Sequence, residues 1–160
     1  MSIDTELDII RQQESALVFP EFTEDTAFEV ASSIRDIARE RGLPILIDIS
    51  RGTNTVVQCS LPGTTPANID FARRKRNTIA MLHASTYRFA LLKADGRSFL
   101  DLMALPERDY AEFGGSFPVT VAGAGVIGSI TVSGLSDRED HNLIVEALST
   151  YLGVTAPRLP

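Results

Sequence analysis

The densest group of residues able to do chemistry lies between Gly114 and His141, where glycines and hydroxyl side chains precede one of the two histidines. Within it, Gly123, Gly125 and Gly128 spell G-x-G-x-x-G after an apolar run. That spacing can cradle a dinucleotide pyrophosphate at the N-terminus of a helix. The motif alone is weak evidence, so the residues around it decide what it means.

The residues after the third glycine contradict a dinucleotide site. Such a site needs a helix that opens at this glycine and an acidic residue about 20 positions later. Ser129 to Ser133 instead alternate polar and β-branched apolar residues, as a strand does. The pattern predicts a β-hairpin, with strands at 117–122 and 126–133 joined by a glycine turn at 123–125.

A second group of candidates lies on a predicted helix that Pro66 starts and that runs to about residue 84. At about 100° per residue, Arg76 and His83 fall within its apolar face. The apolar members of that face are Ile69, Ala72, Ile79 and Ala80. An arginine there can bind a carboxylate through two hydrogen bonds, and a histidine can ligate a metal or carry a proton. The alternative is favoured for each residue taken alone. In it, Arg76 extends to solvent, and His83 lies in the core or an interface with its hydrogen bonds satisfied.

Two helices are predicted before this one, at residues 3–15 and 24–41, each with a hydroxyl residue as N-cap. Gly42 ends the second helix. The segment 16–22 between them contains a proline, so we expect a connection or a short edge strand there.

The periodicity changes to two after the second helix. Alternation from Ile45 to Ser50, followed by an apolar run over 56–61, predicts a β-hairpin. Asp48 falls on the less buried face of this hairpin, where we expect an exposed carboxylate rather than a catalytic one. Cys59 lies in the returning strand, where we expect an inert thiol.

A capping box opens the last helix, because Ser136 and Glu139 can each bond to the other's backbone amide. This helix runs to about Leu152. His141 lies in its first two turns, at the buried edge below the end of the hairpin. We expect residues 153–160 to form a loose tail.

The order of elements predicts the fold class. Helix, helix, hairpin, helix, a short helical cover over residues 85–113, hairpin and helix follow one another, so hairpins and helices are segregated. This favours an α+β fold, a mainly antiparallel central sheet of about five strands with helices packed on it. The length of 160 residues fits a single domain, 1–160.

The composition, 44% hydrophobic and 22% charged, is that of an ordinary globular protein. The acidic start MSIDTELDII does not resemble a signal peptide, and no apolar run approaches the roughly 18 residues of a membrane span. A single cysteine excludes an internal disulfide and a cysteine-based zinc site. We therefore expect a cytoplasmic protein with no metal site. No nucleophile elbow or phosphate loop is present.

Charge is distributed unevenly along the chain. The net charge is −6, and residues 1–29 hold eight acidic residues against one arginine. The one basic run, Arg73 to Arg76, could bind phosphate or nucleic acid, but in an acidic protein such a run is more often a solvated helix face or a subunit contact. Nucleic acid is therefore not the expected partner.

Four short motifs occur in a specific order. They are R-R-K-R-N-T at 73–78, G-G-S-F-P at 114–118, V-S-G at 132–134 and D-x-x-D-H at 137–141. Together they resemble the GlcG/HbpS-like family, also called the heme-degrading domain family, and the first is similar to an uncharacterised small-protein branch of it. The resemblance implies a profilin-like sandwich and assembly into a homo-oligomer. It also implies heme as a cofactor, since some members bind heme or take part in its degradation.

The resemblance leads to the first of two functional hypotheses, a cytoplasmic, oligomeric protein that binds heme or a related small acidic ligand beside the corner at Gly114, Gly115 and Ser116. Arg76 would neutralise an acid group of the ligand, and His83 or His141 would contact metal or carry a proton.

The second hypothesis is a non-catalytic homo-oligomeric assembly or adaptor module. In it, the acidic N-terminal helices meet the basic helix of a neighbouring subunit. The sequence predicts no particular reaction for either hypothesis.

Overall fold

A five-stranded sheet forms the centre of the protein, in a computed structural model that describes all residues from Met1 to Pro160. The strands are β1 Val18–Phe19, β2 Leu46–Arg51, β3 Asn54–Ser60, β4 Ser116–Val121 and β5 Gly125–Ser133. They lie in the order β1-β4-β5-β2-β3. β1 runs parallel to β4, and the other neighbouring pairs are antiparallel. The predicted α+β fold with a mainly antiparallel sheet and two hairpins is therefore confirmed.

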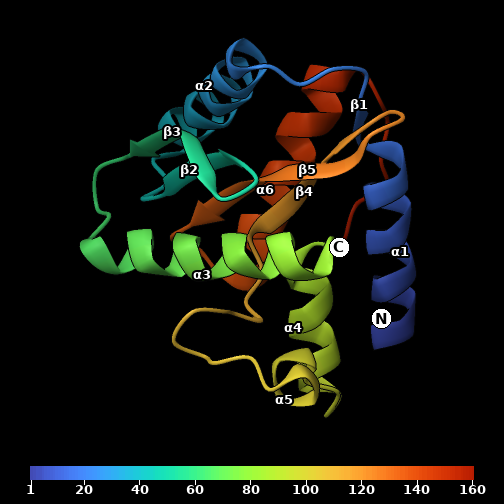
Figure 1. Ribbon diagram of the computed structural model, residues 1–160. Helices are drawn as coiled ribbons and strands as arrows, with labels where there is room; N and C mark the ends of the chain where they lie inside the picture. The colour runs from blue at the N-terminus through green and yellow to red at the C-terminus, as the bar shows by residue number, and fades with distance from the viewer.

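Six helices surround this sheet. They are α1 Ile3–Ala16, α2 Glu24–Arg41, α3 Pro66–Leu82, α4 Thr86–Ala94, α5 Phe99–Met103 and α6 Asp137–Leu152. Of these, α2, α3, α4 and α6 contact its strands, while α1 and α5 contact α4. Figure 1 shows α3 crossing one face of the sheet, with α6 behind the sheet, and α2 contacts α6, β2 and β3. None of these helices combines the length and the hydrophobicity needed to cross a bilayer.

Local signals begin α1, α2 and α6, and end α2, where the sequence predicts. The hydroxyls of Ser2, Thr23 and Ser136 accept hydrogen bonds from amides in the first turns of α1, α2 and α6. Gly42 ends α2 with φ of 65°, a left-handed conformation that glycine adopts without strain. These caps fix where the helices begin and where α2 ends.

The two faces of the sheet differ in character. One face carries Ile47, Ile49 and Ile130, which join α2 and α6 in an apolar core of 22 buried residues. The other face lies under α3 and is polar, although it is also buried. Its residues are each at most 1% exposed, and they are Asp48, Ser50, Ser116, Ser129 and Thr131.

The position of Asp48 corrects the sequence-based expectation of an exposed carboxylate. Asp48 is 1% exposed, because α3 covers its face of the sheet. Its carboxylate accepts hydrogen bonds from Arg76 Nη1 at 3.1 Å and from Gln58 Nε2 at 3.0 Å. Alternation with isoleucine predicted the correct face but not its burial, because the partners that satisfy the charge come from α3 and β3.

The C-terminal end of α3 also differs from the prediction. The helix ends at Leu82, and His83 follows as its C-cap with φ of 54°. His83 is exposed, and it lines a small cavity with Ile79 and Ala80, two members of the helical face on which the sequence placed it. The residues that α3 buries are Ala72, Lys75, Thr78 and Ile79.

The last residues pack against the rest of the protein rather than forming the loose tail that the sequence predicts. Ala156 and Leu159 are 7% and 5% exposed. Gln13 Nε2 of α1 donates to the Pro157 carbonyl at 2.8 Å, and Arg138 of α6 donates to the Pro160 carbonyl at 2.7 Å. The C-terminus therefore lies beside α1, as Figure 1 shows.

Candidate functional site

A buried ion pair joins α3 to the start of α6. Lys75 Nζ lies 3.1 Å from Asp140 Oδ2, and the two side chains are 5% and 2% exposed. Lys75 also donates to the main-chain carbonyl of Val132 at 3.0 Å, and the Leu135 amide donates to Asp140 Oδ1 at 3.0 Å. These contacts compensate the cost of moving both charges out of water.

The glycine corner at residues 114 and 115 makes room for this pair. A Cβ on Gly115 would lie 2.7 Å from Lys75 Nζ and 2.6 Å from the Val132 carbonyl oxygen, and φ at Gly115 is 111°. A Cβ on Gly114 would collide with the carbonyl of Asp137. Both positions therefore require glycine, and the reason is the approach of β5, α3 and α6 to the corner.

Ser116 fixes the corner to the sheet. Its hydroxyl lies 2.7 Å from that of Thr131 on β5, and its amide donates to Thr86 Oγ1 of α4 at 2.9 Å. Ser116 is 0% exposed, so it serves the scaffold rather than contacting a ligand.

A cavity of about 360 Å³ opens beside the ion pair, and its lining contains both Lys75 and Asp140. Asn68, Phe71 and Phe113 also line it, with Asp137 and residues 133–135. The rings of Phe71 and Phe113 pack edge to face, with their centroids 5.9 Å apart. The guanidinium carbon of Arg74 lies 5.6 Å and 5.7 Å from their centroids. The cavity thus combines an aromatic wall with a charged pair.

Burial dominates the electrostatics of Asp140. Loss of solvent raises the pKa of its carboxyl, and the nearby Lys75 ammonium lowers that pKa by less. A carboxyl with a raised pKa, paired with an amine in a cavity, is an arrangement found at sites of proton transfer.

Arg76 lies one position beyond Lys75 but faces a different partner. Its Nη1 bonds to Asp48 Oδ2 at 3.1 Å and to Thr55 Oγ1 at 2.6 Å. It does not line the cavity. Arg76 therefore neutralises a carboxylate of the sheet, and its Nη1 is engaged within the chain.

His141 is sealed inside the protein. It is 0% exposed, its Nε2 lies 2.8 Å from Gln13 Oε1, and its ring lies 5.2 Å from that of Tyr87 and 5.9 Å from that of Phe117. Burial lowers the pKa of His141 to about 3, so the imidazole is neutral at pH 7. His141 does not line the cavity beside the ion pair, and its hydrogen bond joins α6 to α1.

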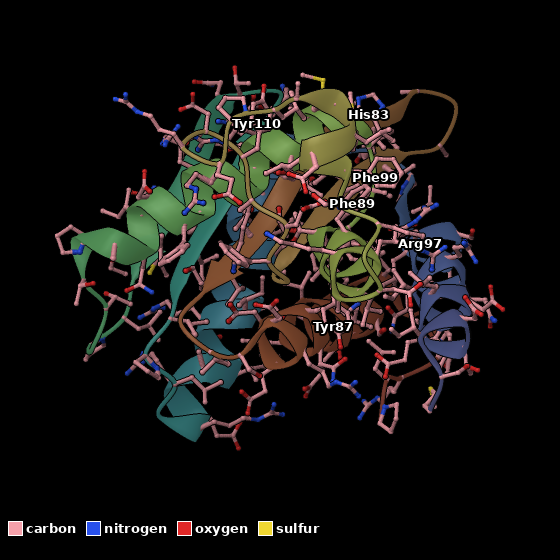
Figure 2. The ribbon with its side chains drawn as sticks, turned by 90° about the horizontal axis from the view of Figure 1, so that it is seen from below. His83, Tyr87, Phe89, Arg97, Phe99 and Tyr110 are labelled. Atoms are coloured by element: carbon pink, nitrogen blue, oxygen red, sulfur yellow. The ribbon has the colours of Figure 1, made fainter.

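His83 lies in a third place. Figure 2 shows it at the end of α3, away from Tyr87, the neighbour of His141. It lines a cavity of about 100 Å³ together with Ile79, Val126, Ile127 and Ser129, among others. The buried Ser129 hydroxyl has no hydrogen-bond partner.

The six residues predicted to bind a cofactor therefore do not converge. Gly114, Gly115 and Ser116 shape the corner beside the larger cavity, while Arg76, His83 and His141 lie at three other places. The sequence prediction missed Lys75, Asp140 and the aromatic wall. The spacing of Ala72, Lys75 and Ile79 on one helical face is the signal that could have found Lys75.

These positions do not fit an enclosed heme. His83 is the one exposed histidine, and the cavity beside it, about 100 Å³, is smaller than the roughly 300 Å³ at which pockets for drug-sized ligands begin. No histidine lines the cavity of about 360 Å³ beside the ion pair. No three His, Cys, Asp or Glu side chains are grouped so that they could hold a metal ion.

Because His141 is neutral when folded but has an ordinary pKa of 6.5 when unfolded, its protonation favours the unfolded chain on acidification. We expect its contribution to stability to fall between pH 6.5 and pH 3, by about 3 kcal/mol at pH 4. Chemical denaturation at pH 7 and pH 4 measures this loss.

The variant His141→Gln should lack this part of the pH dependence of stability. The control variant His83→Asn removes the exposed imidazole and should keep it. Asparagine suits this position because it tolerates left-handed φ. Equal pH dependence in wild type and His141→Gln would contradict the assignment.

Comparison with known proteins gives a consistent result. A family described as "Haem degrading protein HbpS-like" matches residues 22–149. A UPF0303 protein of Paraburkholderia xenovorans is 47% identical over 154 residues, which cover 96% of this chain and 93% of the relative.

Two solved structures share the fold. The Ybr137w protein has a TM-score of 0.84 at 23% identity, over 92% of this chain and 87% of that one. The structure described as a PduOC:heme complex has a TM-score of 0.69 at 18% identity, over 88% of this chain and 100% of that one. At such identities the likeness concerns the fold alone.

Proposed function

Because the chain belongs to the HbpS-like family of heme-degrading proteins, we propose that it is a cytoplasmic protein that binds a small organic ligand in the cavity between α3 and the start of α6. The observation that carries this proposal is the Lys75–Asp140 pair, buried and yet part of the cavity lining. A buried ion pair is often no more stabilising than apolar residues of the same size, so its presence beside a cavity favours a functional role.

The lining indicates the class of ligand. Phe71, Phe113 and Leu135 offer apolar contacts, and the two rings suit a planar, unsaturated body. Lys75 and Asn68 can donate hydrogen bonds, while Asp137 and Asp140 can accept them. A volume of about 360 Å³ lies within the range of small-molecule pockets. A small aromatic molecule with one or two oxygen-containing polar groups matches this combination.

The proposed ligand is not heme, although the family takes its description from heme degradation. The larger cavity offers no histidine to iron, His141 is sealed, and Arg76 is engaged with Asp48. The heme in the PduOC complex is bound by a protein that is 18% identical to this chain, and that identity carries no ligand from one to the other.

The homo-oligomer implied by the resemblance is also part of the proposal. Leu102 and Met103 on α5 are 76% and 42% exposed, and exposed apolar side chains of this size support a contact between subunits. The charge-based adaptor hypothesis is less well supported, because Arg73, Lys75 and Arg76 already pair with acidic residues of their own chain. Arg74 is then the one residue of the basic run without an acidic partner, and it stacks on phenylalanine rings.

The variant Phe71→Ala tests the ligand site. We expect a panel of small aromatic acids and aldehydes, including benzoate and benzaldehyde, to contain a ligand. That ligand should raise the unfolding temperature of the wild type. Loss of a stacking wall should weaken that ligand's affinity about tenfold, which corresponds to ~1.4 kcal/mol. Phe28→Ala is the matched control, since Phe28 is 64% exposed on α2 and outside the cavity. Equal affinities of both variants and wild type would contradict the site.

Titration with hemin tests the exclusion of heme. We expect the absorption spectrum to remain that of free hemin, because no accessible histidine adjoins a cavity of sufficient size. A Soret shift that disappears in His83→Asn would show histidine-ligated heme at the end of α3 and would overturn this exclusion.

A further inference from the structure

We propose that Lys75 reacts as an amine with a carbonyl compound bound in the cavity, forming an imine with Asp140 as the group that accepts and returns the protons. The inference rests on the proposed ligand site and deepens it, because it assigns aldehydes or ketones as the ligand class. It also assigns different chemical tasks to the two members of the ion pair.

The contact between the pair permits two protonation states. An ammonium at Lys75 donates to Asp140 Oδ2 and to the Val132 carbonyl. After transfer of one proton, the carboxylic acid of Asp140 donates to the amine lone pair across the same 3.1 Å, and an amine N–H still donates to Val132. Both states keep the contacts of Lys75 with Asp140 and with Val132. The pair can therefore exchange a proton without rearranging.

The surroundings reduce the cost of the neutral state. The Asp140 side chain is 2% exposed, and this loss of water disfavours its carboxylate relative to the neutral acid. The raised pKa of Asp140 has this same cause. The Leu135 amide stabilises the carboxylate, so the anion also remains accessible for the return of the proton.

The reaction balances with the two side chains alone. The carboxylic acid of Asp140 moves its hydrogen bond from Nζ to the carbonyl oxygen of the ligand, which frees the nitrogen lone pair. Nζ then attacks the carbonyl carbon, an N–C bond forms, and the C=O electron pair moves to oxygen, which takes the proton of Asp140. The resulting carboxylate removes a proton from nitrogen, which gives a neutral carbinolamine. The nitrogen lone pair then forms C=N as the C–O bond breaks, and the hydroxyl leaves as water with the proton of Asp140.

The product is a protonated imine beside a carboxylate. The initial ammonium–carboxylate pair is thus replaced by an iminium–carboxylate pair of equal charge, so the ion pair is preserved through the reaction. The aromatic wall of Phe71 and Phe113 would hold an unsaturated carbonyl compound beside the pair.

The chain offers an internal control, because Lys75 and Lys93 are its two lysines. The Lys93 side chain is 43% exposed and pairs with Glu107, whereas that of Lys75 is 5% exposed. A lysine with a purely structural role would be protected by burial, and an aldehyde would modify Lys93 and the N-terminal amine first. Modification of Lys75 in preference to Lys93 is therefore the distinguishing result.

The experiment incubates the full-length protein with benzaldehyde, reduces any imine with borohydride, and locates the benzyl group by peptide mass spectrometry. We expect Lys75 to be labelled faster than Lys93 in the wild type, and to be labelled equally fast in Lys93→Arg. Asp140→Asn should slow labelling of Lys75 about tenfold or more by removing the proton acceptor. Labelling of Lys93 in the same sample serves as the control.

Label confined to Lys93 and the N-terminal amine overturns the imine. If benzaldehyde also raises the unfolding temperature in a Phe71-dependent manner, the ligand site stands and the covalent step fails. If it causes neither stabilisation nor labelling, the imine fails and benzaldehyde gives no support to the ligand site. If Asp140→Asn does not fold, two results still decide the inference. They are the ratio of Lys75 labelling to Lys93 labelling in the wild type, and the rate of Lys75 labelling in Lys93→Arg.

Discussion

The ion pair between Lys75 and Asp140 is the interaction on which the arrangement around the cavity depends. It connects α3 to α6, and through Val132 it connects both to β5. Because a side chain on residue 115 would occupy the space of Nζ, the pair also explains why the chain has glycine there. Sequence motifs that lie far apart along the chain, from 73–78 to 137–141, thus form one packed unit.

The contrast between the two faces of the sheet also determines where α3 lies. α2 and α6 pack on an apolar face, whereas α3 packs on serine, threonine and aspartate side chains. Arg76 and Asp48 carry the opposite charges of this layer, and Thr55 and Gln58 add hydrogen bonds to this pair. These paired charges fix the register of α3 on the sheet more specifically than apolar packing would. They thereby place Lys75 opposite Asp140.

Periodicity and capping predicted the fold well because they report local physics. The hairpin at 117–133, the capping box at Ser136 and the stop at Gly42 all follow from neighbouring residues. The burial of Asp48 and the docking of residues 153–160 depend on partners distant in sequence, which periodicity cannot supply.

The site was harder to predict than the fold for the same reason. The sequence marked Gly114 and Gly115 correctly as a special corner, but it favoured Arg76 and the histidines over Lys75. Arg76 faces the sheet and its neighbour on α3, Lys75, faces α6, so one position along the helix separates the two environments. Helical periodicity places residues on a face only to within such a step.

The most direct test of the account is to observe both lysine side chains while benzoate is added, by NMR correlation of the methylene groups next to Nζ. Benzoate carries the aromatic ring and the oxygens that the cavity suits, but it cannot form an imine. The account predicts that the signal of Lys75 moves with saturation while that of Lys93 stays in place, because Lys75 lines the cavity and Lys93 does not. Saturable binding that moves the Lys93 signal, or neither signal, would contradict it.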